Sequence, residues 1–203
     1  MRKASLIVGL AALALAWSGL AAQFAPSFTA HMIMHMLVVT VAAPLIALAI
    51  ASTRFDPSAR APFVFAPLPA SLWELVAVWG WHAPALHAFA RGSTAGIVLE
   101  QASFLAAGLI LWVACIGARS AAAGVFGLLF TSMHMTLLGA LLALAPRPLY
   151  AHVHDLAGLS AIEDQNLGGV VMLGVGGAVY LIGGLALMAR LLRTEEGKSC
   201  ASS

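Results

Sequence analysis

Charged residues are scarce in this sequence: Asp, Glu, Lys and Arg make up 9% of its 203 residues, whereas they make up about a quarter of an ordinary soluble domain. The hydrophobic fraction reaches 62%. This composition excludes a soluble globular protein and indicates an integral membrane protein. The net charge of +2 arises from basic residues scattered through short loops. No nucleic-acid partner is therefore expected.

Cysteine pairs and the common catalytic motifs are also lacking. Cys115 and Cys200 are the only cysteines, and they form no Cys-x-x-Cys motif, which argues against a thiolate copper chaperone. The sequence contains no phosphate-binding glycine loop, no Gly-x-Ser-x-Gly elbow and no His-Glu-x-x-His zinc motif. We therefore expect a protein that is not an enzyme.

Long apolar stretches dominate what is present. A membrane-spanning helix needs roughly 20 apolar residues, and about six such stretches lie near 4–22, 29–51, 69–90, 95–117, 122–145 and 167–191. Lipid offers no partners to backbone polar groups, so stretches of this length are expected to be helical. The sequence predicts an all-α polytopic membrane helix bundle of about six transmembrane helices, forming a single membrane domain over residues 1–203.

Residues 1–23 allow two interpretations. A basic start, Arg2-Lys3, followed by an apolar run and the small residues Gly19 to Ala22, is typical of a cleaved secretory signal. Cleavage would leave five spans. The run is long for a signal and lacks an Ala-x-Ala cleavage site, so we favour a retained first transmembrane helix.

Basic residues accumulate at alternate ends of the predicted helices. They are Arg2, Lys3, Arg54, Arg60, Arg119, Arg190, Arg193 and Lys198. The opposite loops contain only Arg91 and Arg147, so the positive-inside rule predicts that both termini, including a tail of residues 194–203, are cytoplasmic. Glycines cluster between residues 168 and 184 of the last stretch, which we interpret as close helix packing.

The sequence His31-Met32-Ile33-Met34-His35-Met36 opens the second apolar stretch. The two histidines are four residues apart, so they share one face of a helix, with Met34 nearby. Thioether sulfur and imidazole nitrogen are ligands suited to Cu(I). The pattern therefore indicates a copper site, and the alternative is that the methionines pack the bundle while each histidine is hydrogen-bonded.

Most other ionisable residues lie toward the same, outer side of the predicted membrane, and the exception is His134, which is expected close to mid-bilayer. An ionisable side chain costs about 2.5 to 3.5 kcal/mol to insert into the membrane, so we expect each of these residues to face a partner or a cavity. The first-choice metal ligands are His31, His35 and His134, with Met34 and Met135 as auxiliary ligands, and with His82 and Glu100 as ligands or as groups that orient them.

Simpler interpretations exist for several of these histidines. His82 follows Trp79 and Trp81 and fits an interfacial aromatic belt. His87, beyond Pro84, is expected to be interfacial rather than ligating. The pair His152 and His154 is expected to be solvated, or to capture a metal ion before it moves inward.

Six sequence blocks occur in an order that resembles a known family. They are His31-x-x-x-His35, Trp81-His82-Ala83-Pro84-Ala85-Leu86, Glu100-Gln101-Ala102-Ser103-Phe104-Leu105, Met133-His134-Met135, Ala145-Pro146-Arg147-Pro148-Leu149-Tyr150 and Glu163-Asp164-Gln165-Asn166-Leu167-Gly168-Gly169. The chain resembles the multi-pass CtaG family of cytochrome c oxidase assembly proteins, over a core that lies within residues 24–193.

This resemblance implies a role in maturing a haem–copper oxidase in the bacterial cytoplasmic (inner) membrane, with oxidase subunits and membrane lipids as partners. The combined hypothesis is that Cu(I) enters from the outer face, binds His and Met side chains, and passes to an oxidase subunit. Two alternatives remain open: a membrane cytochrome in which two histidines ligate haem, and a metal-free scaffold of the oxidase.

Overall fold

A computed structural model describes residues 2–18, 27–150 and 158–201, and within these ranges it contains helices and no strands, which confirms the predicted all-α class. The α-helices are α1 (Arg2–Ala16), α3 (Phe28–Met36), α4 (Ala43–Ile50), α5 (Pro67–His82), α6 (Pro84–Gly92), α7 (Thr94–Ile116), α8 (Ala121–Ala143), α9 (Ala161–Val171) and α10 (Gly177–Ala201). The π-helical segments η1 (Leu37–Ala42) and η3 (Met172–Gly176) continue α3 and α9, and η2 (Pro57–Ala59) is a 3-10 turn.

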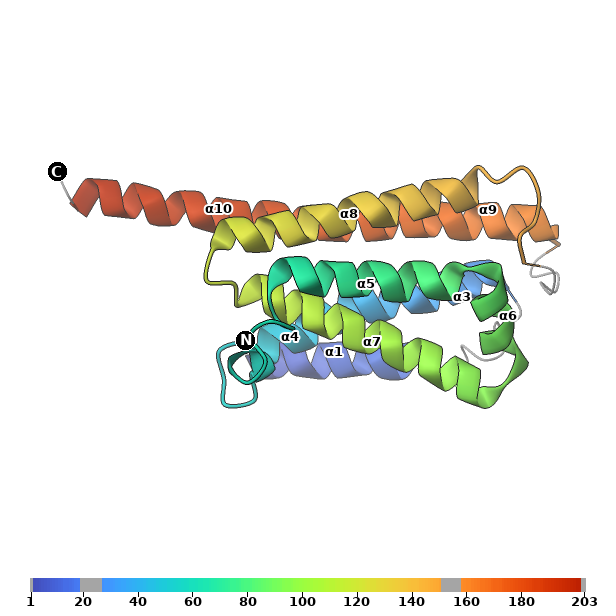
Figure 1. Cartoon of the computed structure of the whole chain (residues 1–203), viewed down its shortest axis with the longest axis horizontal. Coiled ribbons are helices and arrows are strands. Elements are labelled where there is room, and N and C mark those ends of the chain that lie inside the picture. The colour runs from blue at the N-terminus through green and yellow to red at the C-terminus, as the bar shows by residue number, and fades with distance from the viewer. Residues whose placement is uncertain (1, 19–26, 151–157, 202–203) are drawn as a thin grey trace.

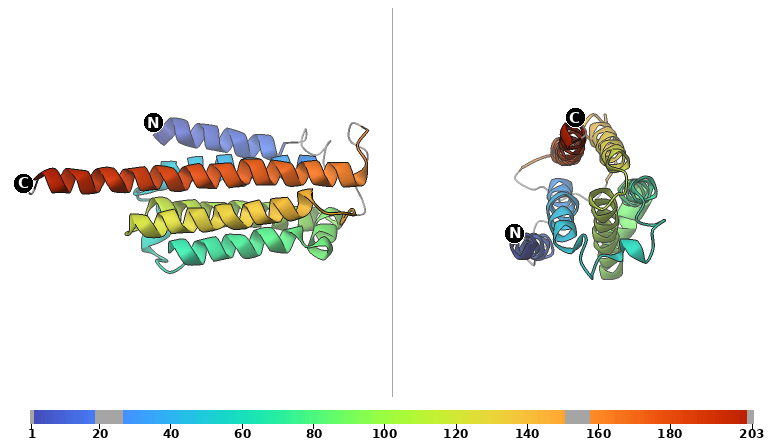
Figure 2. Two further views of the ribbon diagram at one scale, coloured as in Figure 1. Left: turned by 90° about the horizontal axis from the view of Figure 1, so that it is seen from above. Right: turned by 90° about the vertical axis from the view of Figure 1, so that its left-hand side faces the viewer.

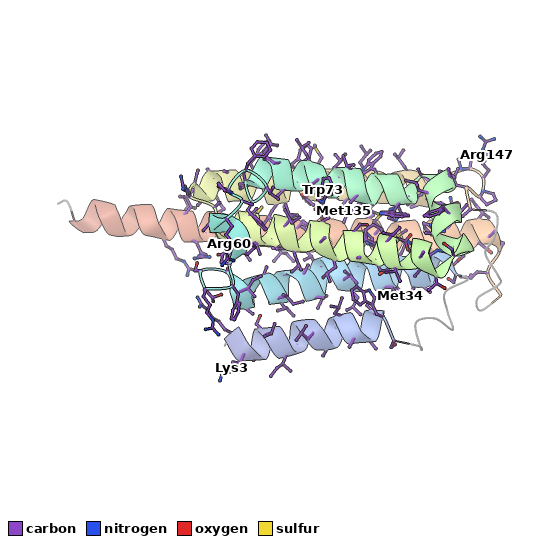
Figure 3. The ribbon with its side chains drawn as sticks, turned by 60° about the horizontal axis from the view of Figure 1, so that its bottom comes forward. Lys3, Met34, Arg60, Trp73, Met135 and Arg147 are labelled. Carbon is purple, nitrogen blue, oxygen red and sulfur yellow. The ribbon has the colours of Figure 1, made fainter. Side chains whose placement is uncertain are left out.

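The long helices run side by side along a common axis, and the short helix α6 lies across one end of the bundle (Figures 1 and 2). Both chain termini point toward the opposite end. Figure 3 shows Lys3 and Arg60 at the end that holds the termini and Arg147 at the α6 end. The predicted orientation depends on these basic residues lying at opposite ends of the bundle. The side of the membrane on which each end lies stays a prediction.

The described helices include four that are long and apolar enough to cross a membrane: Phe28–Ile50, Thr94–Ile116, Ala121–Ala143 and Ala161–Arg193. This supports a membrane protein. Helices α1 and α5 are shorter, with 15 and 16 residues. Residues 19–26, which include the small residues of the possible signal, lie outside the described part, so the count of six spans stays a prediction.

The predicted single helix over residues 69–90 is wrong, because the chain breaks at Ala83. Ala83 is extended, with φ −66° and ψ 132°. It precedes Pro84, whose ring disfavours the helical conformation of the residue before it and which cannot donate a backbone hydrogen bond. Pro84 then begins α6, which turns across the end of the bundle and brings His87 and Arg91 with it.

The predicted break over residues 146–166 is too long, because α9 already begins at Ala161. A capping box starts this helix: the Ser160 hydroxyl accepts from the Glu163 backbone N–H, and the Glu163 carboxylate accepts from the Ser160 N–H. The final helix, α9–η3–α10, is consequently longer than the predicted span of 167–191.

Glycines of the final helix permit close helix contacts, as predicted. A Cβ atom on Gly169 would lie 2.4 Å from the backbone nitrogen of Ala143 in α8, and one on Gly168 would lie 2.6 Å from Cδ1 of Phe28 in α3. Larger side chains at these positions would force the helices apart.

Candidate metal site

Asp164, in the first turn of α9, holds the start of α3. The Ser27 hydroxyl and the Thr29 backbone N–H donate to its Oδ1 at 2.7 and 3.1 Å, and the Phe28 N–H donates to Oδ2 at 2.7 Å. A carboxylate is favoured at a helix N-terminus because the backbone N–H groups there lack partners within the helix. Asp164 therefore fixes the position of the first turn of α3, and thus of His31.

His31 and His35 share the buried face of α3 that their spacing predicts. Their exposed fractions are 1% and 0%. The two rings are nearly parallel, with an interplanar angle of 10° and centroids 6.5 Å apart. Both imidazoles therefore lie inside the bundle at the end covered by α6.

His82 and His87 join them from either side of the break at Ala83. The His82 ring centroid lies 5.4 Å from that of His35 and 5.8 Å from that of His31, and the His87 ring lies 5.2 Å from that of His31. His87 is 8% exposed. The break at Ala83 turns α6 across the end of the bundle and brings the His87 ring against that of His31, and the expectation that His87 is interfacial rather than ligating stays a prediction.

Glu100 brings a carboxylate to the same place from α7. Its Oε2 lies 3.8 Å from Nδ1 of His31 and also accepts a hydrogen bond from the Arg91 guanidinium. The possible ligand atoms of His31, His87 and Glu100 all lie within 4.8 Å of one another. Of the residues that the structure describes, these form the one group of three His, Cys, Asp or Glu side chains with the proximity of a metal site. We call His31, His35, His82, His87 and Glu100 the histidine cluster.

Aromatic side chains enclose the histidine cluster. The Phe104 ring lies 4.0 Å from that of His35, and the Tyr150 ring lies 4.4 Å from that of His87. Phe28 stacks on Tyr150 at 4.4 Å, and the Tyr150 hydroxyl donates to the carbonyl oxygen of His82 at 2.7 Å. These contacts surround the imidazole rings with aromatic side chains.

Most ring nitrogens of the cluster lack a hydrogen-bond partner. The unpartnered buried atoms are both ring nitrogens of His31 and of His35, Nε2 of His82, Nδ1 of His87 and Oε1 of Glu100. Each such atom costs about 1 to 3 kcal/mol if it stays unpaired. A group of unpartnered buried nitrogen and oxygen atoms in one place is consistent with a metal-binding site, because imidazole and carboxylate are common ligands of transition metals.

His87 lies in α6, outside the membrane-spanning helices. Burial and the nearby Arg91 charge lower the pKa of His87 to about 3. Its imidazole is therefore neutral near pH 7, and a neutral imidazole is the form that coordinates metals.

The predicted ligand His134 takes no part in the ring contacts described above for the histidine cluster, and the predicted thioether ligands differ in their burial. The His134 ring packs against Phe130 of its own helix, with centroids 5.7 Å apart. Met135 is fully buried, and the space beside Gly176 is bounded by Met135 and Met36. Met34 is only partly buried, on the side of α3 toward α1 (Figure 3). The structure thus gathers His31, His35, His82 and Glu100 and adds His87. His152 and His154 lie outside the described residues.

A model of the family described as cytochrome c oxidase caa3 assembly factor (Caa3_CtaG) matches residues 1–194. No curated protein and no solved structure matches the chain.

Proposed function

Since the chain belongs to the family of cytochrome c oxidase caa3 assembly factors, we propose that it binds a copper ion at the histidine cluster and hands it to an oxidase subunit in the bacterial cytoplasmic membrane. One observation carries this proposal: unpartnered buried nitrogens of four histidines on α3, α5 and α6 gather beside a buried carboxylate of α7. In this proposal the protein is not an enzyme, and copper is its cargo.

The ligand chemistry of the cluster suits copper. Imidazole nitrogen binds copper and zinc well, and the oxidase that the family resemblance implies needs copper. Ligand atoms that are each about 2 Å from one ion lie at most about 4 Å apart. The 4.8 Å limit for His31, His87 and Glu100 is close to this, so small side-chain rotations would complete the coordination.

Release of the ion is as important as binding for an assembly factor. The cluster offers neutral imidazoles and no thiolate, so Cu(I), the proposed form, would be held without the tighter grip of deprotonated sulfur and could leave by ligand exchange. Arg91 is 20% exposed and pairs with Glu100. In the proposal, its guanidinium neutralises Glu100 when no ion is bound and moves toward solvent when the ion arrives.

Deletion of the gene tests this function. The copper and haem contents of the purified terminal oxidase are measured in the deletion strain, and again after complementation with wild type, His82→Ala or His134→Ala. We expect the oxidase to lose copper and keep haem, and to regain copper with wild type and His134→Ala but not with His82→Ala. Normal oxidase copper in the deletion strain would contradict the proposal.

Two further results would select the alternatives. An absorption spectrum of the isolated protein with a Soret band would indicate a haem-binding cytochrome. Full complementation by every histidine variant, with loss of the oxidase on deletion, would indicate a metal-free scaffold.

A further inference from the structure

A second buried ionisable group lies deeper in the bundle. Glu74 of α5 is fully buried, two turns before His82 on the same helix face, which corresponds to about 12 Å along the axis. The Tyr180 hydroxyl of α10 donates to its Oε1 at 2.5 Å, while its Oε2 has no hydrogen-bond partner. The copper-binding proposal makes no use of this carboxyl group.

The surroundings of Glu74 come from α7, α8, α10 and η1. Tyr180 stacks on Trp112 of α7, with ring centroids 5.5 Å apart. The carbonyl oxygen of Val39, in η1, accepts from Trp112 Nε1 at 3.1 Å and lies 3.4 Å from the Tyr180 hydroxyl oxygen, whose single proton is donated to Glu74. The tyrosine that holds Glu74 is therefore itself held on two sides.

The π-helical turn explains why the Val39 carbonyl is available to these side chains. In this turn the Ala43 N–H donates to the carbonyl of Val38. The next residue, Pro44, has no N–H to offer. The Val39 carbonyl therefore receives neither of these backbone donors and accepts from Trp112 Nε1 instead. A π-helical turn of this kind often marks a functional site.

Within the described residues no ion pair is found for Glu74, whose side chain is fully buried. The other groups beside it are the Thr131 hydroxyl of α8, which is also buried without a partner, and the Cys115 thiol of α7. An isolated carboxylate with one hydrogen bond is far costlier to bury than the neutral acid. The neutral acid would add an O–H donor on Oε2, for which the Thr131 oxygen is a nearby acceptor.

We propose that Glu74 is a proton-binding site separate from the histidine cluster, with the proton on Oε2 and with Oε1 accepting from Tyr180. The ligand of this site is a proton, taken up by the carboxylate to form the un-ionised carboxyl group. A merely structural role would not need a titratable side chain, because glutamine could accept from Tyr180 and donate toward Thr131 in the same way.

Infrared spectroscopy of the full chain in detergent at pH 7 tests the proposal. The C=O stretching band of an un-ionised carboxyl group is compared in wild type, Glu74→Gln and the matched control Glu100→Gln. We expect the band in wild type and in Glu100→Gln, a downward shift in D2O, and its loss in Glu74→Gln. A wild-type spectrum in which Glu74→Gln removes only carboxylate bands would overturn the proposal.

Tyr180→Phe provides a second measurement if Glu74→Gln does not fold. It removes the hydrogen bond to Oε1 and leaves the carboxyl group in place. The carboxyl band should then move to higher frequency at unchanged intensity. Disappearance of the band, or an unchanged frequency, would contradict the assignment to Glu74.

Discussion

His82 donates a hydrogen bond from Nδ1 to the carbonyl oxygen of Val78, at 2.6 Å. A carbonyl can only accept, so the proton must reside on Nδ1, and the lone pair of Nε2 is left free. Nε2 is buried and has no partner. Metal-binding histidines are commonly oriented by such a bond from the opposite ring nitrogen to a backbone carbonyl. His82 is thus already held in the tautomer that a metal ion requires, before any ion is bound.

Replacement of Arg91 should separate copper affinity from stability. In Arg91→Gln, the Glu100 carboxylate loses its cationic partner and becomes free for the ion, while one positive charge leaves the cluster. A positive charge about 6 Å from a bound copper ion, at an effective dielectric constant of about 20, opposes binding by roughly 2 to 3 kcal/mol. We therefore expect Cu(I) to bind at least about tenfold more tightly in a competition titration.

The same variant should be less stable without metal, by about 3 kcal/mol, because a buried carboxylate is left unpaired. The midpoint of thermal unfolding measures this loss, and Arg91→Gln/Glu100→Gln should largely restore it without the gain in affinity. Weaker copper binding by Arg91→Gln would show that Arg91 helps to hold the ion rather than competing with it.

Asp164→Asn should weaken the start of α3. The amide keeps the size of the side chain but loses the charge that favours three donors at the helix N-terminus, a loss of about 2 kcal/mol in the free energy of unfolding. Copper content should fall as well, because His31 lies in the turn that Asp164 holds. Glu163→Gln is the control: among the described residues its exposed side chain bonds only Ser160, so a change within about 0.5 kcal/mol is expected. Equal losses in both variants would argue against this role of Asp164.

Gly168→Ala should disturb the wall of the histidine cluster. The added methyl group would lie 2.6 Å from Phe28 Cδ1, and Phe28 stacks on Tyr150. Overpacking of this kind costs about 1 to 3 kcal/mol. In Gly174→Ala the new methyl group meets nothing within 4 Å, so the helix should gain about 0.5 to 1 kcal/mol. Thermal unfolding of the two variants side by side checks the contrast, and a harmless Gly168→Ala would refute the close contact.

Much of the fold could be predicted from local sequence signals. Apolar length gave the helical class and the cores of most spans, and the spacing of His31 and His35 predicted their shared face. The capping box at Ser160 and Glu163 was an available signal for the start of α9, because a Ser followed three residues later by Glu commonly begins a helix. Likewise, Pro84 signalled the break that divides α5 from α6.

Four members of the cluster were among the predicted ligands, but the inclusion of His87 and the separation of His134 could not be predicted, because they depend on which helices are neighbours. His87 enters the cluster only because α6 folds back across the bundle end. His134 carries the same sequence signal as His35, a methionine on each side, but its ring packs against Phe130. Its role as a ligand, predicted from the sequence, is not part of the copper-binding proposal, and the comparison of histidine variants decides between the two.

The central claim is that the imidazoles of the histidine cluster hold copper. The most direct test is the copper content of the purified full chain after loading with Cu(I), in wild type, His31→Ala, His35→Ala, His82→Ala, His87→Ala and His134→Ala. We expect stoichiometric copper in wild type and in His134→Ala, and a clear loss in each of the other four variants. Equal copper content in wild type and all four cluster variants, or a loss confined to His134→Ala, would contradict the account.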